Sequence, residues 1–356
     1  MKFSLNIIRW IVGLLFIFSG LVKANDPLGL AYKMEEFFEA WDWMWFHNYA
    51  LQLSIVMNVF EVLAGVAIIV GWRAKLFSRL LFLLIIFFTF LTSYVLFSGK
   101  IKNCGCFGDC IPLTPIQTFT KDIALLLMAI VLVLFEKRIK SFFSNIVSLS
   151  IISITVILTI VMQLHVLKHL PFVDCLPYKK GNKILEQMKV PAGAVPDSFA
   201  LTYQYKKNGR LVEFDANNFP NDFDSTYEYV NRIDKIVRKG NATPKIADFT
   251  LKTESGNDTA KALFASGSYI LVFAKDAKNI EQWEPVYEKI KRHGIPVYVV
   301  SADAENMRKQ LKAAIVFSTD ATIIKTAARV QPTFFFMNKD EITDKLSYLD
   351  ADKHQY

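Results

Sequence analysis

The four cysteines have the most specific chemistry in this sequence. Three lie within seven residues, in Cys104-Gly-Cys-Phe-Gly-Asp-Cys110, and the fourth is Cys175. The two glycines of the cluster permit tight turns that bring sulfur atoms together. Such a cluster can hold a structural disulfide, exchange disulfides with other thiols, or bind a metal, although its spacing is not a usual zinc pattern. Cys104, Cys106 and Cys110 are therefore candidate redox residues, and four cysteines leave three pairings open.

Charge and position add to this interpretation. Lys100 and Lys102 lie beside the cluster and would favour a thiolate. Cys175 follows the last apolar segment directly, so we expect it near the same membrane face as the cluster. A bridge from Cys175 to one cluster cysteine would either tether the soluble part of the chain to the helices or form a relay. Cys175 is therefore a candidate disulfide partner.

Glu61 lies in the middle of an apolar segment, with Asn58 about one helical turn before it. A carboxylate near the centre of a bilayer is costly and normally faces the interior of a helical bundle. One interpretation makes Glu61 a proton or quinone contact, so that a quinone is a possible cofactor. The other makes it a hydrogen-bonding group that joins helices. Its expected partners in that case are Ser19, Thr89 or Thr92.

Five apolar segments are long enough to cross a bilayer core, which needs about 20 helical residues. The fold class is therefore a membrane all-α bundle followed by a soluble α/β part, because the composition turns polar and charged after about residue 170. The expected spans are Leu5–Val22, Tyr49–Trp72, Leu80–Phe97, Ile116–Phe135 and Ile146–Val166.

Basic residues in the short loops predict the orientation, because cytoplasmic loops are enriched in Lys and Arg. Five crossings then place the C-terminal part outside the cytoplasm. The net charge of +8 does not indicate a nucleic-acid partner, because no clustered basic face is apparent. The groups used for the orientation are Lys2 and Arg9; Arg73, Lys75 and Arg79; and Lys137, Arg138 and Lys140.

The polar half predicts two parts. Residues 171–242 read as a linker or subdomain with a hairpin, Tyr203–Glu213, that turns at Asn208-Gly209. Residues 243–356 alternate strands and helices, which indicates a small α/β sheet. The predicted elements there are strands Tyr269–Ala274, Pro296–Ser301 and Thr333–Met337, and a helix Trp283–His293 with Pro285 in its first turn and Gly294 at its end.

The membrane part resembles two related families. Ser19-Gly-Leu-Val-Lys23, Asp26-Pro27 and Ala31-Tyr-Lys33 resemble the opening of the DoxX family of bacterial membrane proteins, and Glu61 with Gly65 and Gly71 resembles its second helix. Cys104-Gly-Cys-Phe-Gly108 and Phe119-Thr-Lys-Asp122 resemble MauE-type bundles, which are linked to disulfide formation in the cell envelope. This resemblance covers roughly residues 1–140, with residues 141–170 as a fifth helix.

The C-terminal part, residues 243–356, resembles a thioredoxin-like domain. Pro332 matches the position of the cis-proline of that fold. The place of its Cys-x-x-Cys motif reads Lys275-Asp-Ala-Lys-Asn-Ile-Glu-Gln-Trp283, so the resemblance implies a domain without the usual disulfide chemistry. The whole arrangement is similar to DoxX proteins of the Bacteroidetes with a C-terminal extension.

These observations lead to three hypotheses. The first is a multi-pass protein of the cell inner membrane, with a periplasmic C-terminal domain, that takes part in quinone-linked thiol–disulfide redox chemistry or in assembly of envelope proteins. Its partners would be the lipid bilayer and an envelope protein client. The second is a non-enzymatic membrane scaffold with structural disulfides. The third is a small-solute transporter that uses Glu61. No metal site is expected, and His165 and His169, although spaced i, i+4, fit the polar end of a span.

Overall fold

The computed structural model describes residues 2–101, 103–196, 198–215, 218–238, 240 and 242–353. These residues divide into two compact units. The larger unit contains the apolar helices together with an α/β domain, and comprises residues 1–181 and 250–356. The smaller one is Asn182–Phe249. Lys102 lies outside the described residues.

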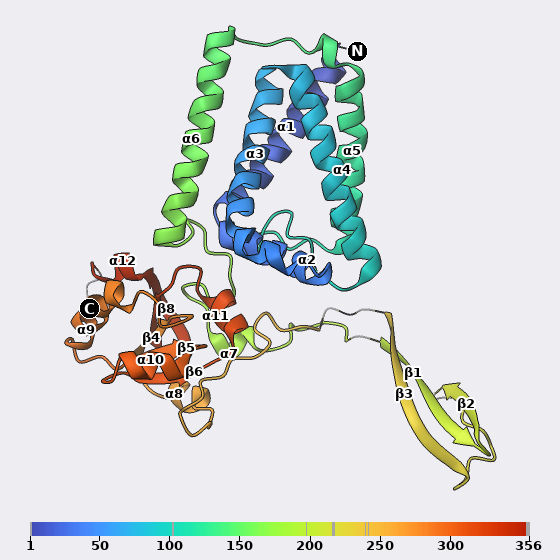
Figure 1. Ribbon diagram of the computed structural model, residues 1–356, viewed down its shortest axis with the longest axis vertical. Helices are drawn as coiled ribbons and strands as arrows, with labels where there is room; N and C mark the ends of the chain where they lie inside the picture. Colours follow the sequence, from blue (N-terminus) through green and yellow to red (C-terminus); the bar gives the residue numbers. More distant parts are fainter. Residues whose placement is uncertain are drawn as a thin grey trace. The chain divides into compact units, whose positions relative to one another are not determined.

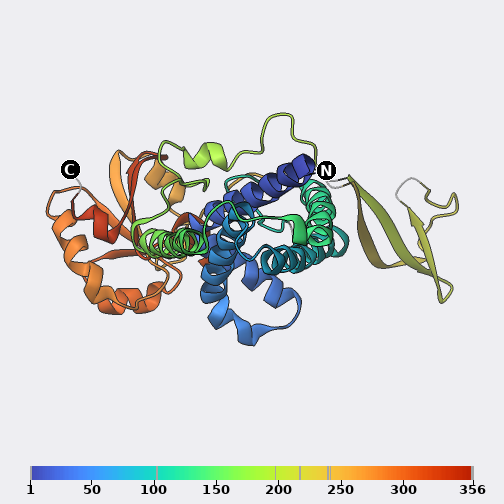
Figure 2. The ribbon, with the colours of Figure 1, turned by 90° about the horizontal axis from the view of Figure 1, so that it is seen from above.

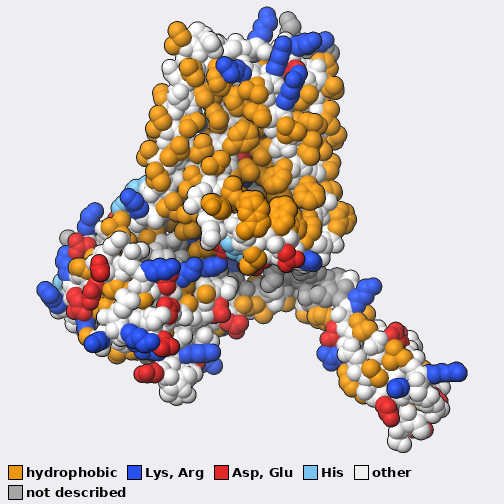
Figure 3. Space-filling view, in the orientation of Figure 1, with side chains coloured by type: hydrophobic (Ala, Val, Ile, Leu, Met, Phe, Trp, Pro, Cys, Tyr) orange, Lys and Arg blue, Asp and Glu red, His pale blue; other side chains and the backbone are white. Residues whose placement is uncertain are grey.

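Among the residues that the structure describes, five helices are long and apolar enough to cross a membrane, which confirms the five predicted spans. Helices α1, α3, α4 and α5 lie side by side, and α6 packs against α3 (Figures 1 and 2). Their outer faces carry many exposed large hydrophobic side chains, as lipid-facing helices do (Figure 3). The chain is therefore a multi-pass membrane protein. The helices are α1 Lys2–Ala24, α3 Ala50–Val70, α4 Ala74–Ser98, α5 Pro115–Leu134 and α6 Asn145–His169.

The segment between the first two spans is helical rather than a plain loop. It forms α2, Pro27–Ala40, and a 3-10 helix η1, Met44–Tyr49. The helix α2 begins where Asp26 caps it, because the Asp26 carboxylate accepts a hydrogen bond of 3.0 Å from the Gly29 N–H. Pro27 occupies the first helical position, where its missing N–H costs nothing.

Glycine allows α1 and α3 to approach closely. A Cβ atom added at Gly13 would lie 2.9 Å from the Gly65 carbonyl oxygen, and one added at Gly65 would lie 2.6 Å from the Gly13 carbonyl oxygen. Neither contact is sterically acceptable, so both positions need glycine. Small residues at such a crossing let the backbones of two membrane helices pack directly.

The basic groups used for the orientation prediction include residues that share one end of the bundle. Arg9 is buried and donates hydrogen bonds to the carbonyl oxygens of Ile68 and Ile69, near the end of α3, and to that of Lys140 before α6. Arg79 forms a 2.7 Å ion pair with Glu136. These hydrogen bonds and this ion pair thus join the loops after α3 and α5 at the end of the bundle that contains the start of α1.

The α/β domain contains one five-stranded sheet in the order β6-β5-β4-β7-β8. Strands β4, β5 and β6 are parallel, whereas β7 is antiparallel to both β4 and β8. Its core is apolar, with Val272, Val299 and Phe334 fully buried. The strands are β4 Ser268–Phe273, β5 Val297–Ser301, β6 Ile315–Ser318, β7 Thr333–Asn338 and β8 Glu341–Ser347; the helices are α8 Ala260–Phe264, α9 Ile280–Lys291, α10 Ala304–Gln310, α11 Ala321–Ala327 and α12 Tyr348–Ala351.

This domain confirms the three predicted strands and adds β6 and β8, which the sequence analysis missed. The predicted start of the helix at Trp283 is wrong, because α9 already begins at Ile280, and Pro285 therefore lies inside it. Ile280 is buried and extends the apolar face of the helix upstream. The peptide bond before Pro332 is cis, as its predicted position implied.

The smaller unit contains a short helix, α7 Ile184–Gln187, and a three-stranded antiparallel sheet in the order β2-β1-β3. Strands β1, Ser198–Lys207, and β2, Arg210–Asp215, form the predicted hairpin. Its turn residues, Asn208 and Gly209, have φ values of 50° and 80°, as a type I′ turn requires. The third strand, β3 Tyr227–Arg238, was not predicted.

Candidate thiol and disulfide site

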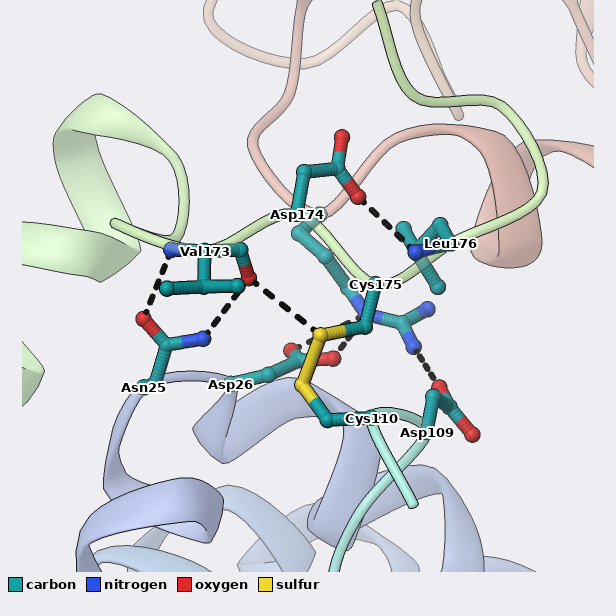
Figure 4. The surroundings of a disulfide bond; sticks show 9 residues. Asn25, Asp26, Asp109, Cys110, Val173, Asp174, Cys175 and Leu176 are labelled. Carbon is teal, nitrogen blue, oxygen red and sulfur yellow. Dashed lines mark hydrogen bonds and ion pairs between the residues drawn. A yellow bond between two sulfur atoms is a disulfide. The ribbon is translucent and has the colours of Figure 1, made fainter. Parts of the chain in front are cut away.

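A disulfide joins Cys110, in the loop between α4 and α5, to Cys175, which follows α6 (Figure 4). The two Cα atoms are 4.8 Å apart, within the range that a disulfide spans. This confirms the expected bridge from Cys175 to the cluster and selects Cys110 as its partner. The bond ties the segment that leads into the second half of the chain to the helical bundle.

Cys104 and Cys106 are free thiols and lie in contact with each other. Cys104 is buried and Cys106 is partly buried. Gly105, with φ of 70°, permits the sharp bend between them, and the following turn is closed by a 2.9 Å hydrogen bond from the Gly108 N–H to the Gly105 carbonyl oxygen. Two sulfurs of this loop therefore meet as predicted, as the Cys104/Cys106 thiol pair, whereas Cys110 bonds to Cys175 outside the loop.

The two free thiols differ in acidity. The hydrogen bond from the Cys104 thiol lowers the pKa of Cys106, and the ammonium groups of Lys121 and Lys23 act in the same direction. The same hydrogen bond and burial raise the pKa of Cys104 well above its usual range. Cys106 is therefore the better nucleophile. Lys121 of α5 and Lys23 of α1 thus have the effect that was predicted for Lys100 and Lys102, of which Lys102 lies outside the described residues.

Glu61 is fully buried in α3 and pairs with Lys23 of α1. The Ser19 hydroxyl lies 3.0 Å from a Glu61 carboxylate oxygen and 3.0 Å from the Cys106 carbonyl oxygen, so it can donate to either. Ser19 was one of the expected partners, whereas Lys23 was missed. The other expected partners lie elsewhere: Thr92 donates to Asp122, at 3.1 Å, and Thr89 donates to its own helix.

A second ion pair lies on α5, where the partly exposed Lys121 ammonium is 2.8 Å from the buried Asp122 carboxylate. The Lys121 ammonium also lies 4.9 Å from the centre of the Phe107 ring, within the cysteine loop. These two residues were not predicted to belong to the site. Two charged residues in an apolar span could have indicated it, because such residues rarely face lipid.

An apolar cavity of about 320 Å³ adjoins the thiol pair. Its polar wall includes Ser19, Lys23, Lys121 and Asp122, and Glu61 is behind this wall rather than in it. Three other lining residues are exposed on the outer faces of α3 and α4 and therefore mark a lipid-facing opening: Leu53, Val56 and Phe87. The remaining wall is rich in aromatic and sulfur-containing side chains, including Met34, Phe37, Phe38, Trp41, Met57, Phe60, Phe88, Cys104, Cys106 and Phe107.

Metal coordination finds no support in the part of the chain that the structure describes, where no three His, Cys, Asp or Glu side chains group as ligands. The His165 and His169 rings stack with centres 4.5 Å apart. His169 also lies 3.0 Å from the Asp350 carboxylate. The two histidines therefore have contacts at the end of α6 that do not involve a metal.

In the α/β domain, the segment after β4 carries no cysteine and leads into α9. The Lys275 N–H donates a 2.6 Å hydrogen bond to the Gln331 side chain, just before the cis peptide bond. These residues line a small polar hollow with Asp276, Gln282 and Trp283. The described residues of this hollow include no cysteine. Any thiol chemistry of the chain therefore belongs to the cysteines in and next to the membrane part.

Comparison with known proteins gives two partial family matches. Residues 1–135 match the family of the methylamine utilisation protein MauE. Residues 199–239 match a domain of unknown function (DUF8463). The chain is also 30% identical over 128 residues to Protein TlpB of Flavobacterium psychrophilum. That match covers 35% of this chain and 35% of the relative, so the chain spans about a third of the relative's length. No solved structure matches.

We predict that the Lys23–Glu61 pair behaves as a buried ion pair. Removing one partner, in Lys23→Met or Glu61→Leu, leaves an uncompensated charge and should cost about 3–5 kcal/mol, whereas replacing both should restore most of the loss. Glu61→Gln should cost less than Glu61→Leu because the amide still offers Lys23 and Ser19 an oxygen. Thermal unfolding of the detergent-solubilised protein would measure each change.

The matched control is Lys33→Met, which breaks the partly exposed Lys33–Glu36 pair of α2. Such a pair contributes about 0–1 kcal/mol, so this variant should remain close to the parent. A double variant no more stable than the single ones would contradict the assignment.

We also predict that Cys106 reacts with a maleimide at lower pH than an ordinary thiol, whose pKa is about 8.5. The reacting species is the thiolate, so a lowered pKa moves the rate profile toward acid. Cys104→Ala removes the hydrogen bond, and should move the Cys106 profile toward higher pH. Peptide mass spectrometry after timed alkylation would give the profile of each thiol. A Cys106 profile unaffected by Cys104→Ala would refute the hydrogen bond as the cause.

Proposed function

We propose that this protein oxidises thiols of envelope proteins and passes the electrons to a quinone in the membrane. The observation that carries the proposal is the Cys104/Cys106 thiol pair in the wall of an apolar cavity that opens toward the lipid side. A structural thiol pair needs no such cavity. The resemblance to MauE-type bundles, with their link to disulfide formation, supports the same conclusion.

The proposed reaction moves two electrons from a client dithiol to a quinone in three steps. A client dithiol reduces the Cys110–Cys175 disulfide by thiol–disulfide exchange, which makes the client disulfide and two free thiols. These thiols reduce a Cys104–Cys106 disulfide in the same way. The Cys104/Cys106 dithiol then loses two electrons and two protons to a quinone, which becomes a hydroquinone. Just before this last step, Cys110 and Cys175 would be bonded and Cys104 and Cys106 would be free, which is the pairing described above.

The cavity wall supplies the groups that the last step needs. The apolar and aromatic side chains suit a flat ring with a hydrocarbon tail, and the opening between α3 and α4 suits a ligand that arrives through the bilayer. Lys23, Lys121 and Asp122 face the cavity beside the thiols and can stabilise a thiolate or transfer protons. Glu61 acts through Lys23 and Ser19, because it does not line the cavity itself.

The other parts of the chain have supporting roles in this proposal. The α/β domain, residues 243–356, would be a thioredoxin-like domain that binds a client or partner without reacting with it. Residues 171–242 would form an extracytoplasmic linker or subdomain, and residues 1–140 the membrane bundle, with its fifth helix at 141–170. The protein would lie in the cell inner membrane with these parts in the periplasm, where disulfides persist.

The redox proposal predicts which cysteines are trapped as thiols in cells. Cys104→Ala removes the Cys104–Cys106 disulfide that reoxidises the second pair, so Cys110 and Cys175 should accumulate as thiols. Cys106→Ala interrupts the same step and should give the same result. Cells are quenched with acid and alkylated with a maleimide, and adducts are resolved by non-reducing electrophoresis. In cells that lack quinones, Cys104 and Cys106 of the parent protein should be trapped as thiols.

A different outcome would favour the scaffold hypothesis, which the Cys110–Cys175 disulfide also fits. The four cysteines would then keep one oxidation state whatever the quinone supply, and Cys110 and Cys175 would stay oxidised in both variants. That result would overturn the redox proposal.

The proposed topology predicts that a reporter that works only after export is active when fused after Tyr356. Arg9, Arg79 and Lys140 lie at the same end of the bundle. Cytoplasmic loops are enriched in Lys and Arg, so we expect this end in the cytoplasm and the C-terminal part outside it. A reporter that works only in the cytoplasm, fused at the same place, is the control. Its activity would contradict the topology.

A further inference from the structure

Each cysteine of the disulfide directly follows an aspartate, and each aspartate pairs with a cation of the α/β domain. Asp109 precedes Cys110 and accepts a 2.7 Å contact from the Arg329 guanidinium. Asp174 precedes Cys175 and lies 2.7 Å from the Lys345 ammonium. Figure 4 shows the two aspartates beside the disulfide. The α/β domain thus holds the chain on both sides of the bond.

Both cations are almost fully buried, with side chains only 5% exposed. Arg329 follows α11 and also binds Asp26, with its Nε atom 2.9 and 2.8 Å from the two carboxylate oxygens. Its guanidinium lies 5.4 Å from the centre of the Tyr32 ring. Arg329 therefore connects the α1–α2 junction, the cysteine loop and the α/β domain.

Lys345 lies in β8, and its ammonium is 5.2 Å from the centre of the Phe335 ring in the neighbouring strand β7. Both cations therefore come from ordered parts of the sheet domain. A cation in such a position is costly if its carboxylate moves away, because its charge is then buried without a partner.

The disulfide and the ion pairs depend on one another. While the bond is intact, Cys110 and Cys175 keep Asp109 and Asp174 next to each other, although 65 residues of chain separate the cysteines. Arg329 and Lys345, fixed on one domain, conversely keep the two segments together. Formation of the disulfide and docking of the domain are therefore linked equilibria, and each changes the equilibrium constant of the other by the same factor.

We propose that Arg329 and Lys345 are positioning residues for the Cys110–Cys175 disulfide. The docked α/β domain holds the two cysteines at bonding distance and makes the disulfide harder to reduce. Reduction, in which a dithiol reductant supplies two electrons and is itself oxidised to a disulfide, in turn loosens the docking of the domain. The inference concerns this disulfide alone and requires neither a quinone nor a client.

The test measures how readily the disulfide opens in the full-length protein in detergent. The protein is equilibrated with mixtures of reduced and oxidised dithiothreitol, quenched with acid and alkylated. Mass spectrometry of the peptides that contain Cys110 and Cys175 then gives the reduced fraction. Arg329→Gln and Lys345→Met should each shift the midpoint about fivefold or more toward reduction, the lower end of a usual coupling.

The matched control is Lys289→Met, which breaks an ion pair with Asp352 in the same domain. Both of those side chains are about half exposed, and neither contacts the disulfide segments in the described ion pairs. This variant should leave the midpoint unchanged. Unshifted midpoints in folded Arg329→Gln and Lys345→Met would overturn the proposal.

A second measurement does not depend on the folding of any variant. In the parent protein, reduction of the disulfide should speed amide hydrogen exchange in β8 and α11, which carry or adjoin the two cations. Exchange in β4, the central strand of the sheet, should be unchanged and serves as the reference. Equal exchange in β8 and α11 before and after reduction would overturn the proposal, whatever the result of the thiol–quinone experiment.

Discussion

A charge inside a membrane-spanning bundle must have a partner, and this requirement organises the structure. Lys23 and Glu61 neutralise each other between α1 and α3, and Lys121 and Asp122 do so on α5. An isolated ion would cost several kcal/mol in such surroundings, so the Lys23–Glu61 pair holds α1 against α3. Asp122 is neutralised on its own helix and joins α5 to α4 through the Thr92 hydroxyl. The thiol pair lies where these groups meet the cysteine loop, since Ser19 contacts both Glu61 and the Cys106 carbonyl oxygen. The polar wall that keeps the helices together is therefore also the wall of the candidate site.

The same rule operates at the junction with the α/β domain, although there water is closer. Arg329 forms ion pairs with Asp26 and Asp109, and Lys345 forms one with Asp174. The three carboxylates belong to segments far apart in the sequence, and the disulfide joins two of them covalently. Burial of Lys345 lowers its pKa, while the Asp174 carboxylate opposes this shift. The domain that carries these cations is thereby joined to the bundle by ion pairs beside the Cys110–Cys175 disulfide.

Much of this architecture could be predicted from local patterns. The spans follow from runs of apolar residues, and the hairpin follows from Asn208-Gly209, because these signals need only neighbouring residues. The strands β6 and β8 were missed since each is short or mixed in character, and their burial depends on the rest of the sheet. Glu61 was recognised as a buried carboxylate, but its partner Lys23 was not, because it stands 38 positions away in sequence. The pairing of Cys110 with Cys175 likewise depends on where two distant segments meet.

The cysteine loop shows how one short sequence can serve two kinds of sulfur chemistry. Gly105 bends the chain so that Cys104 and Cys106 face the cavity, while the turn at Gly108 separates them from Cys110. Cys104 and Cys106 thus meet cations and an apolar ring-sized space, whereas Cys110 meets Cys175 and the aspartates of the domain junction. Asp109 lies within the same loop and is held by Arg329 of the α/β domain, so the conformation of the loop depends on contacts with both the bundle and this domain.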